Sequence, residues 1–579
     1  MTGSSSAGAG KASLALVSGK VVPDPLVARA FEAIAVAGSD VLAVGSDEEV
    51  RDLVGPRTRV VDLRGRLVLP AFGDAHVHPV SGGLESLRCD LSGLRTRAAC
   101  LDAVAAFSRD LPADAWVLGG GWSMESFPGG VPDAADLDAV VGGRPAFLPN
   151  RDHHSAWVSS GALALAGIDA STPDPKGGRI ERRADGSPSG ALHEDAMRLV
   201  ARLIPRPGPE ELMRALVAGQ RRLHAVGITH YQDACVGEAG ELGVPDTFDT
   251  YVRAAADGTL TAQVVGALWW DRLRGPEQLD DLRTRREKAG PTLGEGVRHV
   301  SGSEGATGSF RASTVKIMVD GVCETFTAAM STPYLGKDGR PSTHRGDLFI
   351  DPEALATAVR AAAAAGFQVH FHAIGDRAVH VALDALAGLS PEARAAGRHH
   401  LAHLQFIEPR DLARFAELDA VANFQPLWAC HEPQMDDLTI PFVGPERAEW
   451  QYSIGSLSRL GARVAFGSDW PVSSPDPIQE IHVAVNRTLS LREGRPGEPE
   501  TTVPFRPAEG LSVRQALSAF SAGVAYVNHE EDRVGVLTPA RRADLVVLDQ
   551  DVLSVPPHQI GDASVVMTVA GGVVVSGDE

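Results

Sequence analysis

Residues 351–373 read DPEALATAVRAAAAAGFQVHFHA, a helical pattern that runs directly into a short apolar strand. The same order occurs at residues 207–234, where PGPEELMRALVAGQRRLHAVG precedes ITHYQDA. Helices that alternate with strands are typical of βα units, whose strands lie parallel in one sheet. These two stretches therefore predict an α/β fold.

Strand-like runs recur through the middle of the chain, at 67–78, 228–234, 262–270, 314–321, 367–373, 399–405, 420–426 and 463–469. Eight such strands with helices between them predict a (β/α)8 TIM barrel. The interval 79–227 is too long for one loop and one helix, so we expect an inserted lobe after the first strand.

Both ends of the chain carry short Val/Leu runs separated by Gly and Asp, which are strand signals. They predict a small β domain built from both termini, with a short disordered lead at the start. The expected organisation is an N-terminal part of this β domain at 1–66 and the barrel at 67–475, with its lobe at 79–227. The C-terminal helices of the barrel follow at 476–533, and the rest of the β domain at 534–579.

The composition is that of a soluble globular protein, with 44% hydrophobic and 22% charged residues. The formal net charge is −20 and no Lys/Arg cluster is present, so no nucleic acid partner is expected. No apolar run reaches the roughly 18 residues of a membrane span, and the N-terminus does not resemble a secretory signal. Five scattered cysteines without a CxxC pair favour a reducing, cytoplasmic location.

Histidines gather where the predicted strands end, at the rim that holds the active sites of barrel enzymes. His76 and His78 follow the first strand, and residues two apart on a strand point to the same side. The full set of candidates at the strand ends is His76, His78, His370, His372, His399, His400, His403 and Asp469. Imidazole nitrogens with a carboxylate oxygen suit zinc or a similar ion. The pattern predicts a metal centre, and the spacing leaves open which histidines of the fifth and sixth strands bind it.

Lys316 lies in the apolar strand TVKIMVDG, where a buried ammonium group needs an acidic partner or must lose its charge. An acidic partner is the commoner solution for an isolated buried lysine. In a metal site a second solution exists, because a neutral lysine can react with carbon dioxide. The resulting carbamate could bridge two metal ions.

Seven segments resemble the amidohydrolase superfamily, in the branch of amidohydrolase family 3 that includes N-substituted formamide deformylases. They read DAHVHP, GGGWSMESFPGG, NRDHHSAWVSS, TVKIMVDG, VHFHAIGDRAV, LAHLQ and FGSDWPV, and the resemblance covers nearly the whole chain. It implies one or two divalent ions, zinc first, and favours His372 over His370 and His403 over its neighbours. The ligands it implies are His76, His78, His372, His403 and Asp469, with Lys316 as the candidate N6-carboxylysine bridge. Homodimers are common in this family.

Two segments depart from the family pattern. Residues 70–74 read PAFGD where the family usually has PGFID or PGFVD, and residues 151–155 read RDHHS where it has RDGHS. The second change places His153 where the family keeps glycine. It therefore bears on the substrate role that the resemblance gives to His154.

The candidates for substrate contact are Trp122, His154, Glu194 and Arg377. Trp122 lies in the inserted lobe, where packing inside the lobe is an equal alternative to a pocket wall. Arg377 follows Asp376, and a structural pair between the two is the simpler interpretation.

The expected reaction is hydrolysis of a non-peptide carbon–nitrogen bond in a small amide by metal-activated water, with Asp469 as the proton-transferring residue. A mononuclear deaminase or a cyclic-amide or lactone hydrolase of the same fold is the main alternative, and phosphotriester hydrolysis stays open. A deaminase would be expected to place a glutamate close behind a histidine of the fifth or sixth strand, and Glu408 fits that position poorly. A non-catalytic barrel is the remaining alternative, although every ligand position is occupied by a suitable residue.

Overall fold

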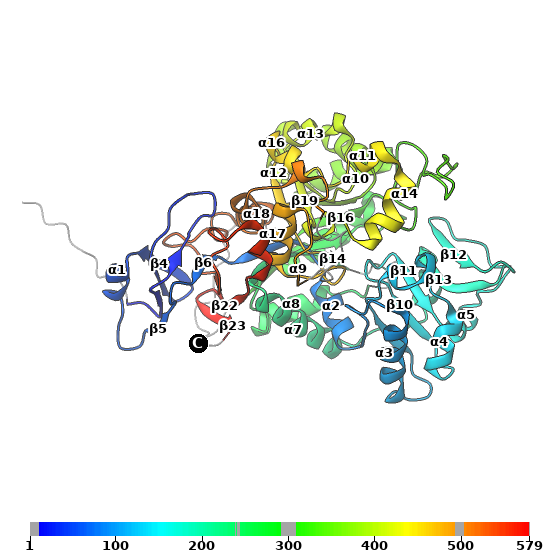
Figure 1. The fold of residues 1–579 in the computed structure, drawn as a ribbon, viewed down its shortest axis with the longest axis horizontal. Coiled ribbons are helices and arrows are strands. Elements are labelled where there is room, and N and C mark those ends of the chain that lie inside the picture. Colours follow the sequence, from blue (N-terminus) through cyan, green and yellow to red (C-terminus); the bar gives the residue numbers. More distant parts are fainter. Residues whose placement is uncertain (1–10, 238, 240–243, 291–307, 493–502, 578–579) are drawn as a thin grey trace, which may run out of the picture.

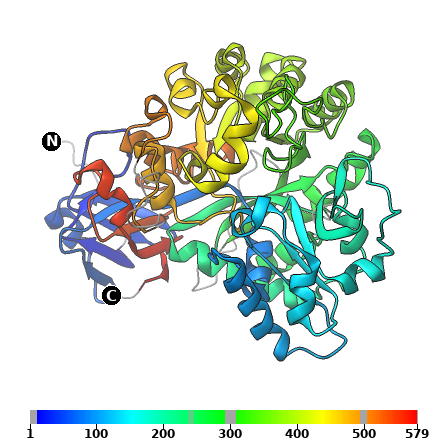
Figure 2. The same cartoon turned by 45° about the vertical axis from the view of Figure 1, so that its right-hand side comes forward.

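The computed structural model describes residues 11–237, 239, 244–290, 308–492 and 503–577. The disordered lead expected at the N-terminus falls on residues 1–10, outside the described residues. Three parts are visible in Figure 1: a β domain at the left, a central barrel, and a lobe at the lower right. The 45° turn of Figure 2 keeps the β domain and the lobe at opposite ends of the barrel.

Eight parallel strands form one sheet in the order β20-β19-β18-β17-β16-β15-β14-β7, which confirms the predicted barrel. The strands are β7 (Phe72–Val77), β14 (Ile228–Val236), β15 (Gln263–Trp269), β16 (Ser309–Met318), β17 (Gln368–Ala373), β18 (His400–His403), β19 (Val421–Phe424) and β20 (Val464–Phe466). The two end strands complete the ring, because Asp469 N donates to His76 O over 2.7 Å. Gly467 permits this approach, since a Cβ there would lie 2.5 Å from His76 N.

Helices cover the outside of the barrel. They are α2 (Pro79–Ser86), α7 (Pro209–Ala225), α8 (Phe248–Asp257), α9 (Leu279–Ala289), α10 (Pro352–Ala364), α11 (Asp376–Ala387), α12 (Pro391–Gly397), α13 (Leu412–Glu417), α16 (Ile454–Arg459), α17 (Pro477–Asn486), α18 (Val513–Ala519) and α19 (Ala522–Val527). Helix α10 shows how the sequence sets these bounds: Asp351 accepts hydrogen bonds from Glu353 N and Ala354 N, and Pro352 takes the first helical position. Among the described residues, every helix is too short or too polar to cross a membrane.

The first barrel strand begins later than the predicted 67–78. Strand β6 (Leu67–Pro70) instead joins the β domain, pairing antiparallel with β21 (Leu545–Leu548) and parallel with β2 (Lys20–Val21). The chain changes sheet at Ala71, whose N–H bonds to Asp544 O of the C-terminal segment, 2.9 Å away. The backbone groups of Leu67–Pro70 can form strand hydrogen bonds in either sheet, so the apolar sequence does not reveal which sheet this segment joins.

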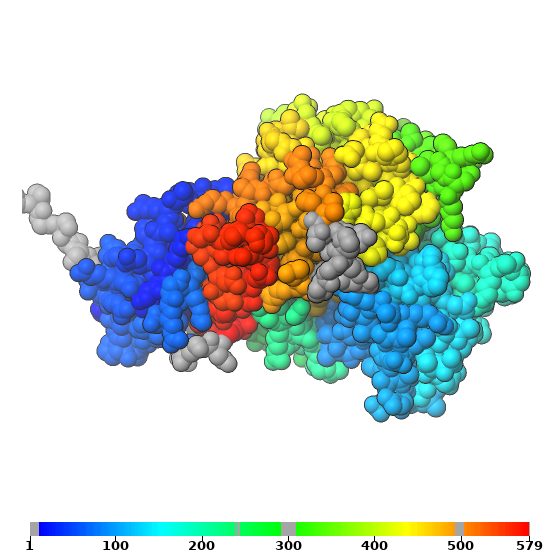
Figure 3. Space-filling view, in the orientation of Figure 1, coloured from blue at the N-terminus to red at the C-terminus, as the bar shows by residue number. Residues whose placement is uncertain are grey.

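The β domain contains two sheets, and both termini contribute to its core. One sheet has the order β4-β3-β1-β5, and the other has the order β2-β6-β21-β22-β23. Its remaining strands are β1 (Leu14–Val17), β3 (Ala33–Ala37), β4 (Asp40–Gly45), β5 (Arg59–Asp62), β22 (Val565–Ala570) and β23 (Val573–Ser576), with the short helix α1 (Asp47–Arg51). Ile34, Val68, Val547 and Val569 are buried together in one cluster. Figure 3 shows the N-terminal and C-terminal segments side by side at that end of the molecule.

The lobe interrupts the connection between β7 and β14. Its sheet has the order β12-β13-β11-β10-β9-β8 and packs against its own helices. The elements are β8 (Cys89–Asp90), α3 (Arg97–Arg109), β9 (Val117–Gly120), α4 (Ala134–Val141), β10 (Ala146–Pro149), β11 (Ser155–Val158), α5 (Ser160–Ala166), β12 (Gly178–Arg182), β13 (Pro188–Glu194) and α6 (Arg198–Ala201). An insertion after the first barrel strand was expected at 79–227. The elements of the lobe run from β8 to α6, whereas α2 and α7, which lie inside those bounds, pack on the barrel.

Candidate functional site

A cavity of about 70 Å³ opens at the carboxyl ends of the barrel strands, where the lobe meets the barrel. All six residues predicted to bind metal line it: His76, His78, Lys316, His372, His403 and Asp469. The first two come from β7 and the helix that follows it, and the other four come from four further strands or strand ends. The barrel thus brings together side chains that lie up to several hundred positions apart in the sequence.

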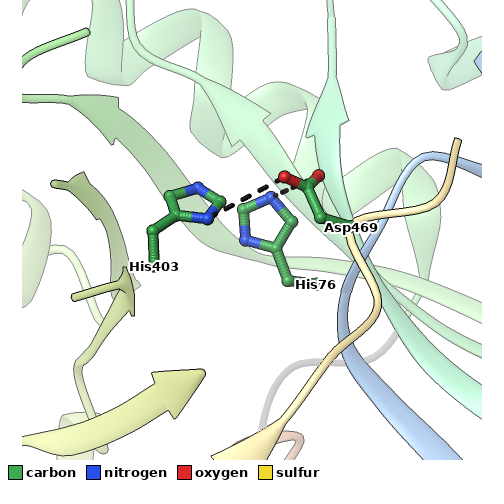
Figure 4. Close-up of side chains that lie close together, drawn as sticks. All are labelled: His76, His403 and Asp469. Carbon is green, nitrogen blue, oxygen red and sulfur yellow. Dashed lines mark ion pairs between the residues drawn. The ribbon is translucent and has the colours of Figure 1, made fainter. Parts of the chain in front are cut away.

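His76, His403 and Asp469 form the tightest group in the cavity (Figure 4). Each offers a ligand atom, and these atoms lie within 4.8 Å of one another. His76 Nε2 is 3.3 Å from Asp469 Oδ1, and His403 Nδ1 is 3.8 Å from Asp469 Oδ2. His78 joins them, with its Nε2 3.1 Å from Asp469 Oδ1. One carboxylate therefore faces three imidazole rings.

The electrostatics of this group favour an ionised Asp469 beside neutral His76 and His403 rings, because burial lowers the pKa of both imidazoles. Burial alone would raise the pKa of Asp469, but the adjacent His76, His78 and His403 hold it well below its usual range. Burial, with a smaller contribution from nearby Lys316, lowers the pKa of His76 to about 3. An anionic oxygen beside neutral ring nitrogens is the protonation state that metal binding requires.

The hydrogen bonding of the cavity residues also supports binding of a divalent ion. Asp469 Oδ1 is buried and has no well-aligned hydrogen-bond partner among the described residues, although His76 Nε2 and His78 Nε2 lie 3.3 and 3.1 Å from it. Buried polar side-chain atoms in folded proteins are nearly always satisfied, so a carboxylate oxygen close to ring nitrogens but without an aligned hydrogen bond fits a group that binds one cation. Nitrogen and carboxylate oxygen atoms are the donors that zinc and related ions take.

Lys316 and His372 complete the wall of the cavity. Lys316 is 2% exposed, and its Nζ lies 3.4 Å from His370 Nε2. No acidic residue in the described part of the chain forms an ion pair with it, so the acidic partner considered from the sequence is not found. Burial lowers the pKa of Lys316 to about 7. The His372 ring is centred 4.5 Å from the His403 ring, within the same cluster.

A second layer of polar residues lies beneath the cavity. The sequence offered its two histidines, His370 and His400, only as alternative ligands and did not single out Gln232. His370 Nε2 lies 2.9 Å from His76 Nδ1, and its Nδ1 lies 2.7 Å from Gln232 Oε1. Gln232 also reaches His400 Nε2 over 3.0 Å. His370 therefore supports the ring of His76 directly, and His400 contacts His370 and Gln232 behind it. This fits the assignment of His372 and His403 as the cavity residues.

Two buried aspartates hold the strand ends in place. Asp74 accepts hydrogen bonds from Ser468 Oγ (2.6 Å), Ser468 N and His76 N, and so ties β7 to the segment after β20. Asp320 accepts from the N–H groups of Ala329, Ile374 and Gly375, and lies 3.5 Å from His372 Nδ1. Burial raises the pKa of Asp74 and that of Asp320 to about 7 each.

His154 faces the cavity from the lobe and forms an ion pair with Glu194. Its Nδ1 lies 2.9 Å from Glu194 Oε1, which also accepts a hydrogen bond from Thr327 Oγ1 over 2.7 Å. Burial alone would lower the pKa of His154, but Glu194 outweighs it and raises the pKa to about 9. Strands β11 and β13 pair with Ser155 opposite His193, which places His154 beside Glu194. Glu194 itself does not line the cavity.

His153 does not displace His154 from the site. Its ring turns to Glu85, with Nε2 2.8 Å from Oε1, and its backbone has a φ of 62°. Such left-handed backbone is natural for glycine, which explains why the family can keep glycine at this position. His403 and Asp469 also have positive φ, at 77° and 54°. Strained backbone at several site residues is typical of functional sites.

Trp122 and Arg377 lie away from the cavity. Trp122 is fully buried in the core of the lobe, where it packs against Phe127 and Trp157 and donates from Nε1 to Leu148 O over 2.7 Å. Arg377 lies half-buried in the first turn of α11 and is not among the residues that line the cavity. Asp376, its neighbour, accepts from Ser331 N instead.

Comparisons with known proteins point to one family. A family profile described as amidohydrolase family matches residues 59–576. The protein LONG AFTER FAR-RED 3 of Arabidopsis thaliana is 30% identical over 93% of this chain and 88% of its own. N-substituted formamide deformylase of Arthrobacter pascens is 26% identical over 94% of each chain. The crystal structure of an uncharacterized metal-dependent hydrolase from Pyrococcus furiosus superposes with a TM-score of 0.68 at 25% identity, covering 93% of this chain and all of that one.

Proposed function

Because the chain belongs to the amidohydrolase family, we propose that it is a metal-dependent hydrolase that cleaves the carbon–nitrogen bond of a small linear N-substituted amide, formamides first. The observation that carries this proposal is the convergence of His76, His403 and Asp469 in one cavity at the carboxyl edge of the barrel. The full-length similarity to an N-substituted formamide deformylase supports the bond class.

Zinc is the proposed metal, because the cavity offers imidazole nitrogens and a carboxylate in a buried setting. His76, His78, His372, His403 and Asp469 are the proposed ligands. When bound, a divalent ion lowers the pKa of water and polarises a carbonyl oxygen.

Asp469 is the proposed proton carrier. Its carboxylate stays ionised because three imidazoles face it, so it can accept the proton of the attacking water. The same carboxyl group can then donate that proton to the departing amine, which would otherwise leave as an unstable anion. Asp152 is the other carboxylate among the lining residues, and no glutamate is described there, so a glutamate shuttle of the deaminase type has no support in this cavity.

His154 is the proposed hydrogen-bond donor to the substrate. Its pairing with Glu194 keeps the imidazole protonated and fixes which ring nitrogen faces the cavity. A positive donor in a buried site is best used where negative charge develops, on the carbonyl oxygen of the tetrahedral intermediate.

Lys316 is the proposed carbamate. Its amine is buried, lines the cavity and has no acidic partner among the described residues. A neutral amine adds to carbon dioxide with loss of one proton, which gives a buried carboxylate at this position. Such a group would supply the negative charge that a two-ion site needs.

An activity survey tests the proposed function. The zinc-loaded protein is assayed with linear N-alkylformamides, a cyclic amide, a lactone and a purine nucleoside. We expect release of formate from the formamides, loss of that activity after chelation, and recovery on addition of zinc. Ring opening or ammonia release without formate production would contradict the proposed bond class.

The variant Glu194→Gln tests the role of His154. It leaves a similar side chain but removes the charge that keeps His154 protonated, so we expect kcat to fall about tenfold or more with KM little changed. Metal content should stay at the wild-type value, and Glu194→Asp should recover part of the activity. The control is Glu181→Gln, because Glu181 pairs with His193 in the same lobe sheet but does not line the cavity. Equal losses in the two variants would mean that Glu194 only stabilises the lobe.

A further inference from the structure

A larger cleft adjoins the metal cavity, between the barrel and the lobe. Its volume is about 660 Å³, within the range of small-molecule binding sites. Helix α2, strands β9 and β10, helix α6 and the segment that leads to α7 supply most of its walls. The cleft and the metal cavity share Ser81, His153 and Val244 in their walls, so the two spaces meet at these residues.

The different sizes of the two spaces indicate that the metal cavity holds the reacting group and the outer cleft holds the rest of the substrate. The inner cavity, at about 70 Å³, has room for a few waters or one functional group. It cannot hold the whole of a typical substrate. The reacting amide of a substrate can lie among the metal ligands while the rest of the molecule extends past His153 into the outer cleft.

Each acidic residue that lines the cleft is already neutralised by a partner. Glu85 pairs with His153, Asp195 with Arg272 at 2.7 Å and Asp246 with Arg285 at 2.6 Å. Among the cations, Arg88 pairs with Glu211 at 2.7 Å. These pairs leave no uncompensated negative charge among the described lining residues.

Three cations of the cleft remain without a carboxylate partner in the described part of the chain. They are Lys176, Arg198 and Arg202, and all three line the same space. They give this concave wall a local positive charge in a chain whose net charge is −20. Charge of one sign in a cleft concentrates ligands of the opposite sign, and guanidinium groups bind carboxylates and phosphates through paired hydrogen bonds.

We infer that the outer cleft binds an anionic group at the far end of the substrate. The inference rests on the proposed function and adds the class of substrate to it: an amide joined by an apolar spacer to a carboxylate or phosphate. Leu84, Leu118, Phe147 and Leu199 supply apolar wall for the spacer. Lys176, Arg198 and Arg202 receive the anion.

A substrate series tests the inference through turnover. The zinc-loaded enzyme is assayed with N-formyl ω-amino acids of increasing chain length and with N-formylalkylamines of matched length. We expect kcat/KM to be about tenfold or more higher for one length of the carboxylate series. In the double variant Arg198→Gln/Arg202→Gln, KM for the carboxylate substrate should rise until its kcat/KM is about equal to that of the matched neutral substrate. The kcat/KM of the neutral substrates should change less than about twofold. The control Arg222→Gln alters an exposed arginine of α7 outside the cleft and should keep the preference.

A binding experiment separates this inference from the proposed function. Adipate, hexyl phosphate and hexane-1,6-diol are titrated into the intact protein by calorimetry, which needs no turnover. Binding of either anion but not the diol, weakened about tenfold in the double variant, supports the cleft even if no formamide is hydrolysed. The tighter of the two anions identifies the anionic group. The inference is overturned if neither anion binds, or if the double variant binds them as tightly as the wild type. The proposed hydrolysis is then unaffected, because the activity survey tests it separately.

Discussion

Replacing Asp469 by Asn should lower kcat for the hydrolysed amide by about 10² to 10⁴-fold. Asparagine keeps one side-chain oxygen in place but cannot accept and return the proton of the attacking water. The three imidazoles that face this carboxylate stay in position, so most of the metal should stay bound. The measurement pairs steady-state kinetics with elemental analysis of the same sample.

A matched control for this variant is Asp436→Asn. Asp436 also pairs with a histidine, His431, at 2.7 Å, but it does not line the cavity. Its activity should stay close to that of the wild type. Near-wild-type turnover of Asp469→Asn would remove Asp469 from the mechanism, and loss of all metal would restrict it to a ligand role.

Replacing Lys316 by Met should reduce both the metal content and the turnover, the latter by about 10³-fold, because the group that would bridge two ions is lost. Methionine fills a similar volume in the apolar strand, so the fold should persist. Intact-mass measurement of the wild-type protein should show one added carbon dioxide per chain under conditions that preserve carbamates. The variant should lack it.

The exposed Lys337 offers the control, as Lys337→Met. It should keep the wild-type mass gain, metal content and activity. Full metal content and activity in Lys316→Met would show that the lysine is a buried structural residue. Loss of activity without any carbon dioxide on the wild-type protein would assign Lys316 a role as a free amine.

The sequence was sufficient to predict the barrel, because its strands are short apolar runs and helices such as α10 and α17 begin with an Asp-Pro start signal. The exception is Leu67–Pro70, where an apolar run continues without a break across two sheets. Its partner strands decide which sheet receives it: β2, earlier in the chain, and β21, nearly 480 positions later. Local pattern carries no information about such a distant partner.

The sequence predicts which residues line the candidate site when they lie at strand ends. It does not predict the contacts that support them from other strands. His76 and His78 are two positions apart in the sequence and their rings are centred 5.2 Å apart, and all predicted ligands line one cavity. The support of His76 by His370 and Gln232 depends on the closure of the barrel. Trp122 illustrates the opposite case, since an aromatic side chain in the lobe can line a pocket or fill the core, and here it fills the core.

Metal content per chain tests the central claim most directly. Protein purified without chelator, then dialysed against excess zinc and desalted, is measured by elemental analysis beside the variant His76→Asn/His403→Asn. We predict at least one zinc-class ion per wild-type chain, and two where Lys316 carries carbon dioxide. The double variant should bind far less, because two of the three residues of the central group are gone. A wild-type chain that holds no ion after this treatment would contradict the metal-dependent mechanism.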